Sequence, residues 1–402
     1  MSNNGNNNNN NTNTNDVDEI EKILQMEINS SDNEQQNNQQ NDQSKREQVE
    51  KYFDSMTAQD KMRLLKKRKI CGLVEGCDTI EGYQKLNRIH EGVYGEVFRA
   101  RDMLTGEIVA IKKIKFSQHI DKEGFPITSI REFNLLLSLN HPNIVKVKRI
   151  VMGSDKVFMV MEYMEHELKD LIERSKYQFS TAEIKCLLRQ LLLGIQHFHQ
   201  KSVMHRDLKT SNLLYNNKGQ LKVCDFGLGR RCQRNKPYTL KVVTLWYRAP
   251  ELLLSIPKYN HKIDIWSAGC IFGELLLKDQ LFKGQKEMEQ LEHIFRILGT
   301  PTEETWPGLK NITLAGPLRT IPKYPGIKLQ DIISKEFQLS EWGYDLLKKM
   351  LTLDPEKRIE ASDALKHPWF SEQPLPLSED LMPTFPPLNE VNRDDVRKKV
   401  KK

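Results

Sequence analysis

The sequence predicts an α+β fold in which a small β-rich lobe is followed by a larger helical lobe. Short runs of β-branched and aromatic residues, bounded by turn signals, occupy most of the chain from Tyr83 to Met161. Beyond Leu168, apolar residues recur mainly at helical spacing. Strands that come first and helices that come later indicate that the two kinds of element are segregated into separate lobes.

The β-rich lobe is expected to begin with three antiparallel strands. Apolar runs at Tyr83–Ile89, Glu96–Ala100 and Ile108–Lys113 are separated by turn signals at Glu91–Gly95 and Thr105–Glu107. Turns this short between strand-like runs are typical of hairpins, so we expect the three strands to be neighbours in one sheet.

One helix should interrupt the strands, beginning at Thr128 just behind Pro126. Its expected apolar positions are Ile130, Phe133, Leu136 and Leu137. Two further strands are then expected at Val145–Met152 and Val157–Met161. The later helices are predicted at Thr181–His199, Asp264–Leu277, Met288–Leu298 and Trp342–Leu351.

Composition excludes several classes of protein. The chain has 402 residues, 38% hydrophobic and 29% charged, so it can bury a sizeable core in two or three domains or in one large bilobal domain. Six cysteines exclude a disulfide-stapled secreted scaffold, and we interpret all six as free thiols. The chain lacks a run of about 18 apolar residues and has a polar N-terminus, so neither a membrane span nor a secretory signal is expected.

The first 80 residues are predicted to form a disordered tail. Ten of the thirteen positions from Asn3 to Asn15 are asparagine, and a second Gln/Asn tract spans Gln35–Gln43. Such a segment has too little apolar surface to offset the entropy of ordering. Apolar residues between Val17 and Ile28 fit either a fluctuating local helix or a partner-binding helix. The basic run Lys61–Lys69 fits either a nuclear localisation signal or the solvent-exposed face of a helix.

The strongest chemical signal is the segment HRDLKTSN at residues 205–212. Asp207 can accept a proton from a hydroxyl nucleophile, and Lys209 can neutralise charge on a phosphoryl group in transit. Asn212 can offer its amide oxygen to a hard cation, and Asp225, in the string DFG thirteen residues later, is a second such ligand. A lone aspartate in a loop is normally a solvated charge, but that explanation does not account for this whole combination.

The β-rich lobe supplies residues for the rest of a nucleotide site. Lys112, at the end of an apolar strand, could be a solvated edge residue. Because Glu132 lies on the following helix, the better interpretation is an ion pair that directs Lys112 towards the phosphates of a nucleotide. In the turn Glu91–Gly95, Gly92 and Gly95 would let backbone N–H groups approach phosphate, although a plain hairpin uses the same residues.

Together these motifs resemble those of eukaryotic protein kinases of the cyclin-dependent group. Within that group the chain is most similar to the PITSLRE kinases, whose name string reads PITSIRE at residues 126–132, with Ile130 in place of leucine. The string VVTLWYRAPE at residues 242–251 adds to the resemblance. The similarity extends from about Tyr83 to Phe370 and continues weakly into Pro374–Pro387.

The resemblance implies a domain organisation and an activity. Residues 1–80 would be the tail, residues 83–370 a bilobal kinase domain, and residues 371–402 an extension with a basic end. The kinase domain would bind ATP and Mg²⁺ between its lobes and transfer the γ-phosphate to Ser/Thr-Pro sites of proteins.

The resemblance also assigns roles to residues. The catalytic residues would be Asp207, Lys209, Lys112 and Glu132, and the metal ligands would be Asn212 and Asp225. The positions in contact with ATP would be Ile89, Gly92, Gly95, Val97, Ala110, Lys112, Met161, Glu162, Met164 and Leu214. Two structural contacts are implied as well: Glu251 would pair with Arg358, and Asp264 would brace the catalytic loop.

Regulation follows from the same resemblance. Thr239 matches the activating phosphorylation site, and a phosphate there needs several cationic partners. The matching phosphate-clasping residues are Arg131, Arg206 and Arg230. Arg230 also fits a solvated charge run, because another arginine follows it.

A cyclin is the implied regulatory partner. It would dock on the helix at residues 126–139 and push that helix inward, which would bring Glu132 to Lys112 from an otherwise misaligned state. Val243 matches the position whose backbone conformation selects proline immediately after the phosphorylated residue.

Four positions depart from the family pattern or call for comment. His90 replaces the first glycine of the phosphate loop, which should loosen ATP binding without abolishing it. Val93 replaces a threonine that relatives often carry, so only Tyr94 could take an inhibitory phosphate. Gly229 replaces an alanine and should add backbone freedom. Cys224 is either a core-like residue or a thiol that faces the nucleotide.

Two other classes of function compete with an active kinase. A pseudokinase would bind nucleotide or a cyclin without turnover, but such proteins usually lose a catalytic residue, and this chain lacks only a phosphate-loop glycine. A nucleic-acid scaffold would use the basic clusters, which contain no interleaved aromatic residues, and the net charge of +7 is mild. Resemblance to PITSLRE kinases suggests work in the nucleus, on transcription, pre-mRNA processing or cell-cycle control, with the cytoplasm as a second location.

Overall fold

The computed structural model describes residues 78–92, 95–114, 127–153, 156–174, 177–232, 243–256, 258–309, 321–333 and 339–386. Apart from residues 103–105, these belong to one structural unit, and the contacts below lie within it. The predicted tail lies almost wholly outside the described residues, and so do Tyr94, Thr239 and both basic runs.

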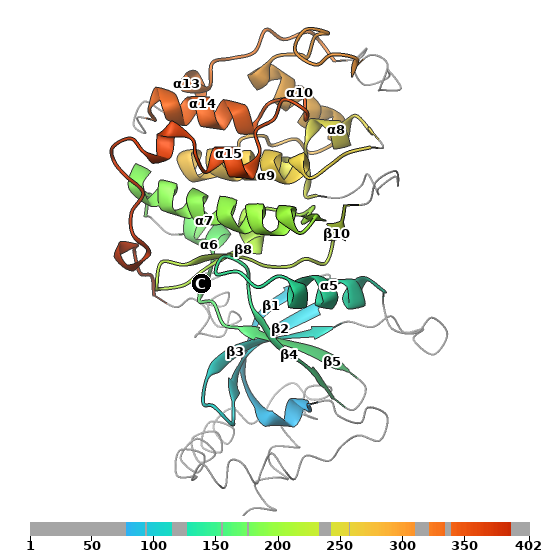
Figure 1. Ribbon diagram of the computed structural model, residues 1–402, viewed down its shortest axis with the longest axis vertical. Helices are drawn as coiled ribbons and strands as arrows, with labels where there is room; N and C mark the ends of the chain where they lie inside the picture. Colours follow the sequence, from blue (N-terminus) through green and yellow to red (C-terminus); the bar gives the residue numbers. More distant parts are fainter. Residues whose placement is uncertain are drawn as a thin grey trace, which may run out of the picture. The chain divides into compact units, whose positions relative to one another are not determined.

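A five-stranded antiparallel sheet forms the small lobe (Figure 1). Its strands are β1 (Tyr83–Gly92), β2 (Gly95–Asp102), β3 (Ile108–Ile114), β4 (Val147–Met152) and β5 (Val157–Glu162). They lie in the order β1-β2-β3-β5-β4, so the five predicted strands and their hairpins are confirmed. β4 begins two residues later than predicted because the Val145 N–H bonds the carbonyl of Val223 in the helical lobe, not β5.

Gly95 is required by the packing of this sheet. Its φ is +146°, and a Cβ atom there would lie 2.2 Å from the carbonyl oxygen of Lys113 on β3. A side chain is therefore impossible without moving the backbone. This structural reason for the glycine is separate from the phosphate-binding role expected from the sequence.

Helix α5 (Ile127–Ser138) lies beside the sheet (Figure 1), but its apolar face differs in part from the predicted one. Phe133 and Leu136 are buried as expected, whereas Ile130 and Leu137 are 43% and 56% exposed. Residues seven apart on a helix share a face, so Ile130 and Leu137 form a second apolar strip that faces outward.

The helical lobe contains the four later helices predicted from the sequence, each within two residues of its expected bounds. They are α7 (Thr181–Gln200), α9 (Lys262–Leu277), α10 (Glu287–Leu298) and α14 (Glu341–Met350). Shorter helices are α6 (Leu168–Arg174), α8 (Pro250–Leu253), α13 (Leu329–Ile332) and α15 (Ala361–Ala364). α7 begins at a capping box, in which Ser180 and Glu183 each accept the other's backbone N–H. Helix α9 is buried along nearly its whole length and forms the centre of the lobe.

Two short sheets carry the loops of the site, and Figure 1 labels one strand of each, β8 and β10. One contains β6 (His166–Glu167), β8 (Leu213–Tyr215) and β9 (Leu221–Val223), in the order β6-β8-β9. The other pairs β7 (Val203–Met204) with β10 (Arg230–Arg231). The HRDLKTSN segment at residues 205–212 therefore connects β7 to β8, and Asp225 lies two residues after the end of β9.

The structure describes four of the six cysteines. Cys186, Cys224, Cys232 and Cys270 are free thiols, while the other two cysteines lie outside the described residues. Among the helices that the structure describes, none is long and apolar enough to cross a membrane.

A buried ion pair connects two distant parts of the helical lobe. Arg358 donates from Nη1 to Oε1 of Glu251 at 2.7 Å and from Nη2 to Oε2 at 2.9 Å. Both side chains are almost fully excluded from solvent, and the guanidinium also lies over the ring of Trp266. The pairing implied by the resemblance is present, and its bidentate geometry offsets the cost of burying two charges.

Replacing Glu251 with alanine should lower the free energy of unfolding by about 3–5 kcal/mol, because the Arg358 charge would stay buried without its partner. Denaturant titration measures the change. Arg296→Ala, which removes an exposed ion pair with Glu292, is the matched control and should have little effect. A loss for Glu251→Ala no larger than that of the control would contradict this account.

Candidate active site

The catalytic loop between β7 and β8 is held by the buried carboxylate of Asp264 on α9. Asp264 accepts the backbone N–H of His205 at 3.0 Å and that of Arg206 at 2.9 Å. The His199 ring also lies 3.0 Å from it. Burial alone would raise the pKa of Asp264, but the bond to His199 and the backbone donors hold that pKa below its ordinary value. The bracing role implied for Asp264 is therefore present.

The brace fixes an uncommon backbone conformation. Arg206 has a φ of +67°, which non-glycine residues rarely adopt. Its guanidinium donates to the carbonyl oxygen of Leu228 at 2.8 Å and to the hydroxyl of Tyr259 at 2.9 Å. Bonds from both its backbone and its side chain therefore hold Arg206 in this conformation, which sets the direction of Asp207, the next residue.

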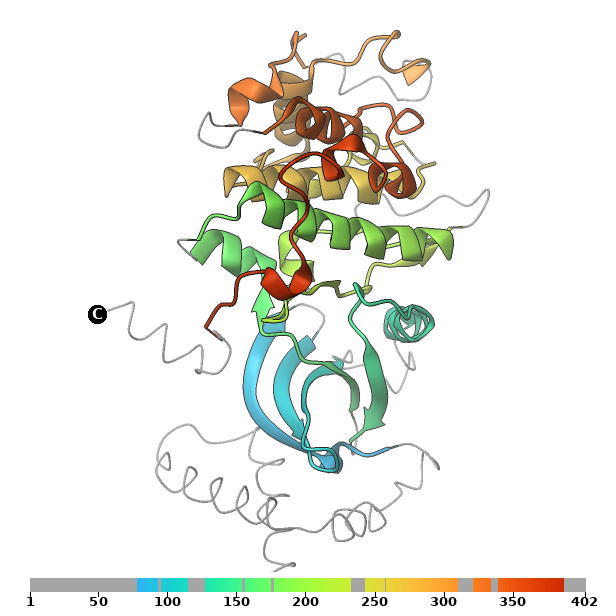
Figure 2. The same cartoon turned by 60° about the vertical axis from the view of Figure 1, so that its left-hand side comes forward.

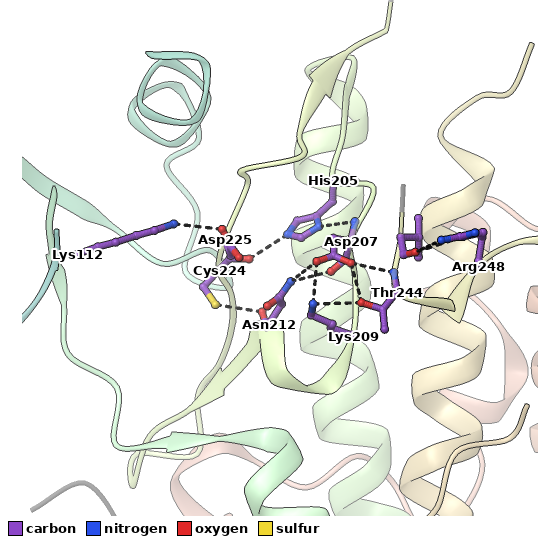
Figure 3. Close-up of polar contacts among 10 residues, drawn as sticks. Lys112, His205, Asp207, Lys209, Asn212, Cys224, Asp225, Thr244 and Arg248 are labelled. Atoms are coloured by element: carbon purple, nitrogen blue, oxygen red, sulfur yellow. Dashed lines mark hydrogen bonds and ion pairs between the residues drawn. The ribbon is translucent and has the colours of Figure 1, made fainter. Parts of the chain in front are cut away.

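Asp207 is oriented by donors from two loops (Figure 3). One carboxylate oxygen accepts the backbone N–H of Thr244 at 3.0 Å and its hydroxyl at 3.1 Å. The other oxygen lies 2.9 Å from Nζ of Lys209, and the Asn212 amide donates to the Asp207 carbonyl oxygen at 2.8 Å. The structure thus brings together the acid, the cation and the amide of the sequence motif.

Thr244 is a site residue that the sequence reasoning missed. Its hydroxyl donates to Asp207 and also accepts a hydrogen bond from Lys209 at 3.1 Å, so it connects the two. Thr244 is 37 residues from Asp207, and no spacing rule joins them. The one available signal was its place in the string at residues 242–251, which was used only to support the resemblance.

Lys112 joins two carboxylates at the junction of the lobes. Its Nζ lies 2.7 Å from Glu132 on α5 and 3.2 Å from Asp225 (Figure 3 draws the second contact). Burial favours the neutral amine, but the two carboxylates outweigh burial and hold the pKa of Lys112 above its ordinary value. Lys112 is therefore a cation at neutral pH. The structure describes only this aligned arrangement, and the misaligned state expected before cyclin binding stays a prediction.

The residues around Asp225 lock it towards Lys112. Asp225 has a φ of +60°, and the Phe226 ring that follows it is fully buried. That ring packs edge-to-face on His205, with centroids 4.5 Å apart, and on Phe198 at 5.6 Å. Burial would raise the pKa of Asp225, but Lys112 holds that pKa below its ordinary value. Asp225 is thus ionised and available to a cation.

Asn212 and Asp225 fit a hard divalent cation. The Asn212 amide nitrogen donates to the Asp207 carbonyl, which turns the amide oxygen in the opposite direction. The backbone N–H of Cys224 bonds the Asn212 carbonyl at 3.0 Å and so keeps the two ligands close. Among the described residues there is no cluster of three His, Cys, Asp or Glu side chains that could hold a metal. Two protein oxygens suit an ion that takes its other ligands from phosphates and water.

Strand register brings several of the predicted nucleotide contacts onto one face of the small lobe. Val97 lies opposite Lys112 across β2 and β3, and Ala110 lies opposite Met161 across β3 and β5. Directly opposed residues share a face, and so do residues two apart on a strand, so these four side chains lie on the Lys112 face. The predicted adenine-covering residues are therefore next to the predicted phosphate-aligning residue.

The remaining predicted nucleotide contacts lie on the β1–β2 hairpin, at the end of β5 and just beyond it, and on β8. Gly92 pairs with Gly95 at the end of the β1–β2 hairpin, while Ile89 falls at a break in that pairing. The Glu162 carboxylate is bound to Lys222 and to the Lys146 N–H, so only the backbone of Glu162 remains for a nucleotide. Met164 is buried, and Leu214 lies on β8 opposite Glu167.

Comparison with known proteins decides the family, since a protein-family model described as a protein kinase domain matches residues 83–370. The chain belongs to the protein kinase family. Proteins of this family use ATP with a divalent metal, typically Mg²⁺, which agrees with the donor set at Asn212 and Asp225.

Curated relatives place the chain near the cyclin-dependent kinases. It is 54% identical to cyclin-dependent kinase G-2 of Oryza sativa subsp. indica, over 80% of this chain and 46% of the relative. It is 49% identical to cyclin-dependent kinase 11B of Homo sapiens, over 80% and 40%. It is also 49% identical to the serine/threonine-protein kinase PITSLRE of Drosophila melanogaster, over 79% and 34%. The chain thus spans about half the length, or less, of the curated relatives it matches.

The three arginines predicted to clasp a phosphate lie on three different elements. Arg131 is half-buried on α5, Arg206 is buried in the catalytic loop, and Arg230 lies on β10, paired with Met204. Their convergence on a phosphate at Thr239 stays a prediction, because Thr239 lies outside the described residues. Inhibitory phosphorylation of Tyr94 stays a prediction for the same reason.

Three of the four positions singled out against the family pattern now have a structural description. The His90 side chain reaches across the lobes, with Nδ1 3.5 Å from Oε1 of Glu167 on β6. A Cβ atom on Gly229 would lie 2.8 Å from the Leu135 side chain of α5, so the glycine makes room for that helix; the added backbone freedom stays a prediction. Burial raises the pKa of the Cys224 thiol well above its ordinary value, so it is protonated and weakly nucleophilic.

Thr244→Val should lower kcat by about tenfold and leave the KM for ATP unchanged, because it removes a hydrogen bond to the catalytic carboxylate and none to the nucleotide site. Steady-state kinetics at several ATP concentrations measures both constants. Thr244→Ser keeps the hydroxyl and should stay close to the wild type. Equal rates for the valine and serine variants would show that the Thr244 hydroxyl has no part in orienting Asp207.

Proposed function

We propose that the protein is an active serine/threonine protein kinase that transfers the γ-phosphate of Mg-ATP to Ser/Thr-Pro sites of other proteins. The observation that carries this proposal is that two sets of contacts are present together. Lys112 is paired with Glu132 and Asp225, and Asp207 is paired with Lys209. A nucleotide-binding protein without turnover would have no need for an oriented acid next to a partly exposed cation.

The substrate end of the reaction depends on Asp207. The incoming serine or threonine hydroxyl donates its proton to the Asp207 carboxylate as its oxygen forms a bond to the γ-phosphorus. The bond from that phosphorus to the β-phosphate oxygen breaks, and ADP keeps the electron pair. Lys209, 25% exposed and 2.9 Å from Asp207, can move onto the phosphoryl oxygens and neutralise the charge in transit.

The nucleotide end depends on Lys112 and on the two metal ligands. Lys112 is protonated, buried and held by Glu132, so it presents a fixed positive charge for the α- and β-phosphates. Asn212 and Asp225 would hold Mg²⁺, which when bound neutralises phosphate charge and orients the leaving group. The fixed positions of these three side chains mean that little reorganisation is needed when the reaction occurs.

Selection of proline after the phosphorylated residue is supported by the backbone at Val243. Val243 has a φ of +67°, and its carbonyl oxygen accepts two hydrogen bonds from Arg248, at 3.2 Å from Nε and 2.9 Å from Nη2. A substrate N–H near this carbonyl would find the acceptor already occupied, and an unpaired N–H costs about 1–3 kcal/mol. Proline has no N–H and avoids this cost.

A cyclin is the proposed activator. The outward strip of Ile130 and Leu137 offers apolar area on α5, the same helix that carries Glu132, and two relatives carry the name cyclin-dependent kinase. We further propose a nuclear location and a role in transcription, pre-mRNA processing or cell-cycle control. The basic run Lys61–Lys69 supports the location, and imaging of the chain with that run replaced by alanines would check it.

Phosphate transfer from Mg-ATP to a Ser-Pro peptide should require Asp207. The full chain is assayed with and without candidate cyclins, and Asp207→Asn, which keeps the shape but cannot accept the proton, should lose at least about 100-fold in kcat. A cyclin should increase the rate of the wild type. Absence of transfer with every cyclin, while ATP binds and Thr239 is phosphorylated, would contradict the proposal.

The same assay tests substrate choice. A Ser-Pro peptide should have at least about a tenfold higher kcat/KM than the matching Ser-Ala peptide, because only the alanine N–H is left unpaired. Arg248→Ala frees the Val243 carbonyl and should reduce that ratio. If wild type and Arg248→Ala discriminate equally, the occupied carbonyl is not the cause of the preference.

A further inference from the structure

Residues 371–386, here called the C-terminal strap, run back along the helical lobe to the far side of the nucleotide site. Figures 1 and 2 show this red segment crossing α7 towards β8. The Leu377 N–H bonds the carbonyl of Ala182 in the first turn of α7 at 3.0 Å. Lys185, fully buried on α7, donates to the strap carbonyls of Glu372 at 3.0 Å and Pro374 at 2.8 Å. The strap is therefore fixed to the lobe along its length.

The strap ends in an aromatic socket. The Phe385 ring contacts four rings edge-to-face, with centroid distances of 5.9 Å to His166, 5.5 Å to Tyr177, 6.2 Å to Phe179 and 5.9 Å to Tyr215. Burial lowers the pKa of His166, so that ring is neutral and packs as an aromatic residue. Four edge-to-face contacts give one side chain a specific position on this surface.

Backbone contacts fix the strap independently of the ring. Asn217 donates to the Phe385 carbonyl at 2.9 Å and accepts the Phe385 N–H at 2.8 Å. The Tyr215 hydroxyl donates to the carbonyl of Pro383 at 2.5 Å. Gly219 has a φ of +75°, and a Cβ atom there would lie 1.8 Å from the Glu379 carbonyl oxygen, so the turn after β8 leaves space for the strap.

The socket lies on the reverse face of the strands that form the floor of the nucleotide site. His166 pairs with Tyr215, and Glu167 pairs with Leu214, across β6 and β8. Since successive residues on a strand point to opposite faces, His166 and Tyr215 share one face and Glu167 and Leu214 share the other. The contact between Glu167 and His90 of β1 shows that this second face is turned towards the small lobe.

We propose that Phe385 is a positioning residue for ATP, an inference that rests on the proposed kinase function. β6 and β8 contain only two and three residues, and strands this short cannot hold their place by pairing alone. Phe385 packs on His166 and Tyr215 and so supports the face of β6 and β8 that is turned away from the nucleotide. Leu214 and Glu167, on the opposite face, then stay where the adenosine of ATP would contact them. The strap thereby makes ATP affinity depend on the C-terminal end of the domain.

The test compares nucleotide affinity in strap variants of the full chain. Phe385→Ala should raise the Kd for a fluorescent ATP analogue with Mg²⁺, and the KM for ATP, by about three- to tenfold, with kcat little changed. Phe385→Tyr keeps the ring and should restore the affinity. Leu381→Ala is the matched control, because Leu381 lies on the same strap and is 66% exposed.

Thermal unfolding without nucleotide separates positioning from general stability. A lower unfolding temperature for Phe385→Ala with an unchanged Kd would give the strap a purely structural role and overturn the proposal. If Phe385→Ala does not fold, Asn217→Ala takes its place: a raised Kd supports the proposal and an unchanged Kd overturns it. The titration needs no phosphate transfer, so a wild type that binds the analogue without turnover would refute the proposed function and leave this inference testable.

Discussion

The hydrogen bonds that the Asp264 carboxylate accepts from the backbone N–H groups of His205 and Arg206 are the interaction on which the site depends most. They hold Arg206 at a positive φ, which non-glycine residues avoid, and so determine where Asp207 points. The same brace fixes His205, whose ring packs on Phe226 and keeps the adjoining aspartate turned towards Lys112. A single buried carboxylate on the central helix of the large lobe thus constrains both the acid at the substrate end and the carboxylate at the nucleotide end.

Three non-glycine residues with positive φ lie at the functional positions of this site. Arg206 precedes the catalytic acid, Asp225 is a predicted metal ligand, and Val243 adjoins the proposed proline position. Such conformations persist only where surrounding bonds hold them, and here the bonds are visible: Asp264 holds Arg206, and Arg248 holds the Val243 carbonyl. Local backbone strain therefore occurs where the orientation of a functional group has to be fixed. The buried helix α9 and the Glu251–Arg358 ion pair provide the rigid surroundings.

Local patterns predicted the elements of the fold well, since hairpin turns and helical periodicity are properties of short stretches of sequence. They failed where a contact joins distant residues: Thr244 reaches Asp207 over 37 positions, and Asn217 reaches Phe385 over 168. They also failed where only the tertiary partner decides the outcome. Periodicity could not tell which apolar strip of α5 is buried, and the reason for Gly229 became visible only once Leu135 was placed against it.

The most direct test of this account is the rate and nucleotide affinity of Asp264→Asn. An asparagine keeps the shape but turns one acceptor oxygen into a donor, so at least one loop N–H is left without a partner. A shift of about 1 Å in a catalytic group can cost about 100-fold in rate. We expect kcat to fall by that order while the Kd for ATP changes less than kcat, since Glu132 on α5 still pairs with Lys112. A variant whose kcat matches the wild type would contradict the claim that this brace positions the catalytic acid.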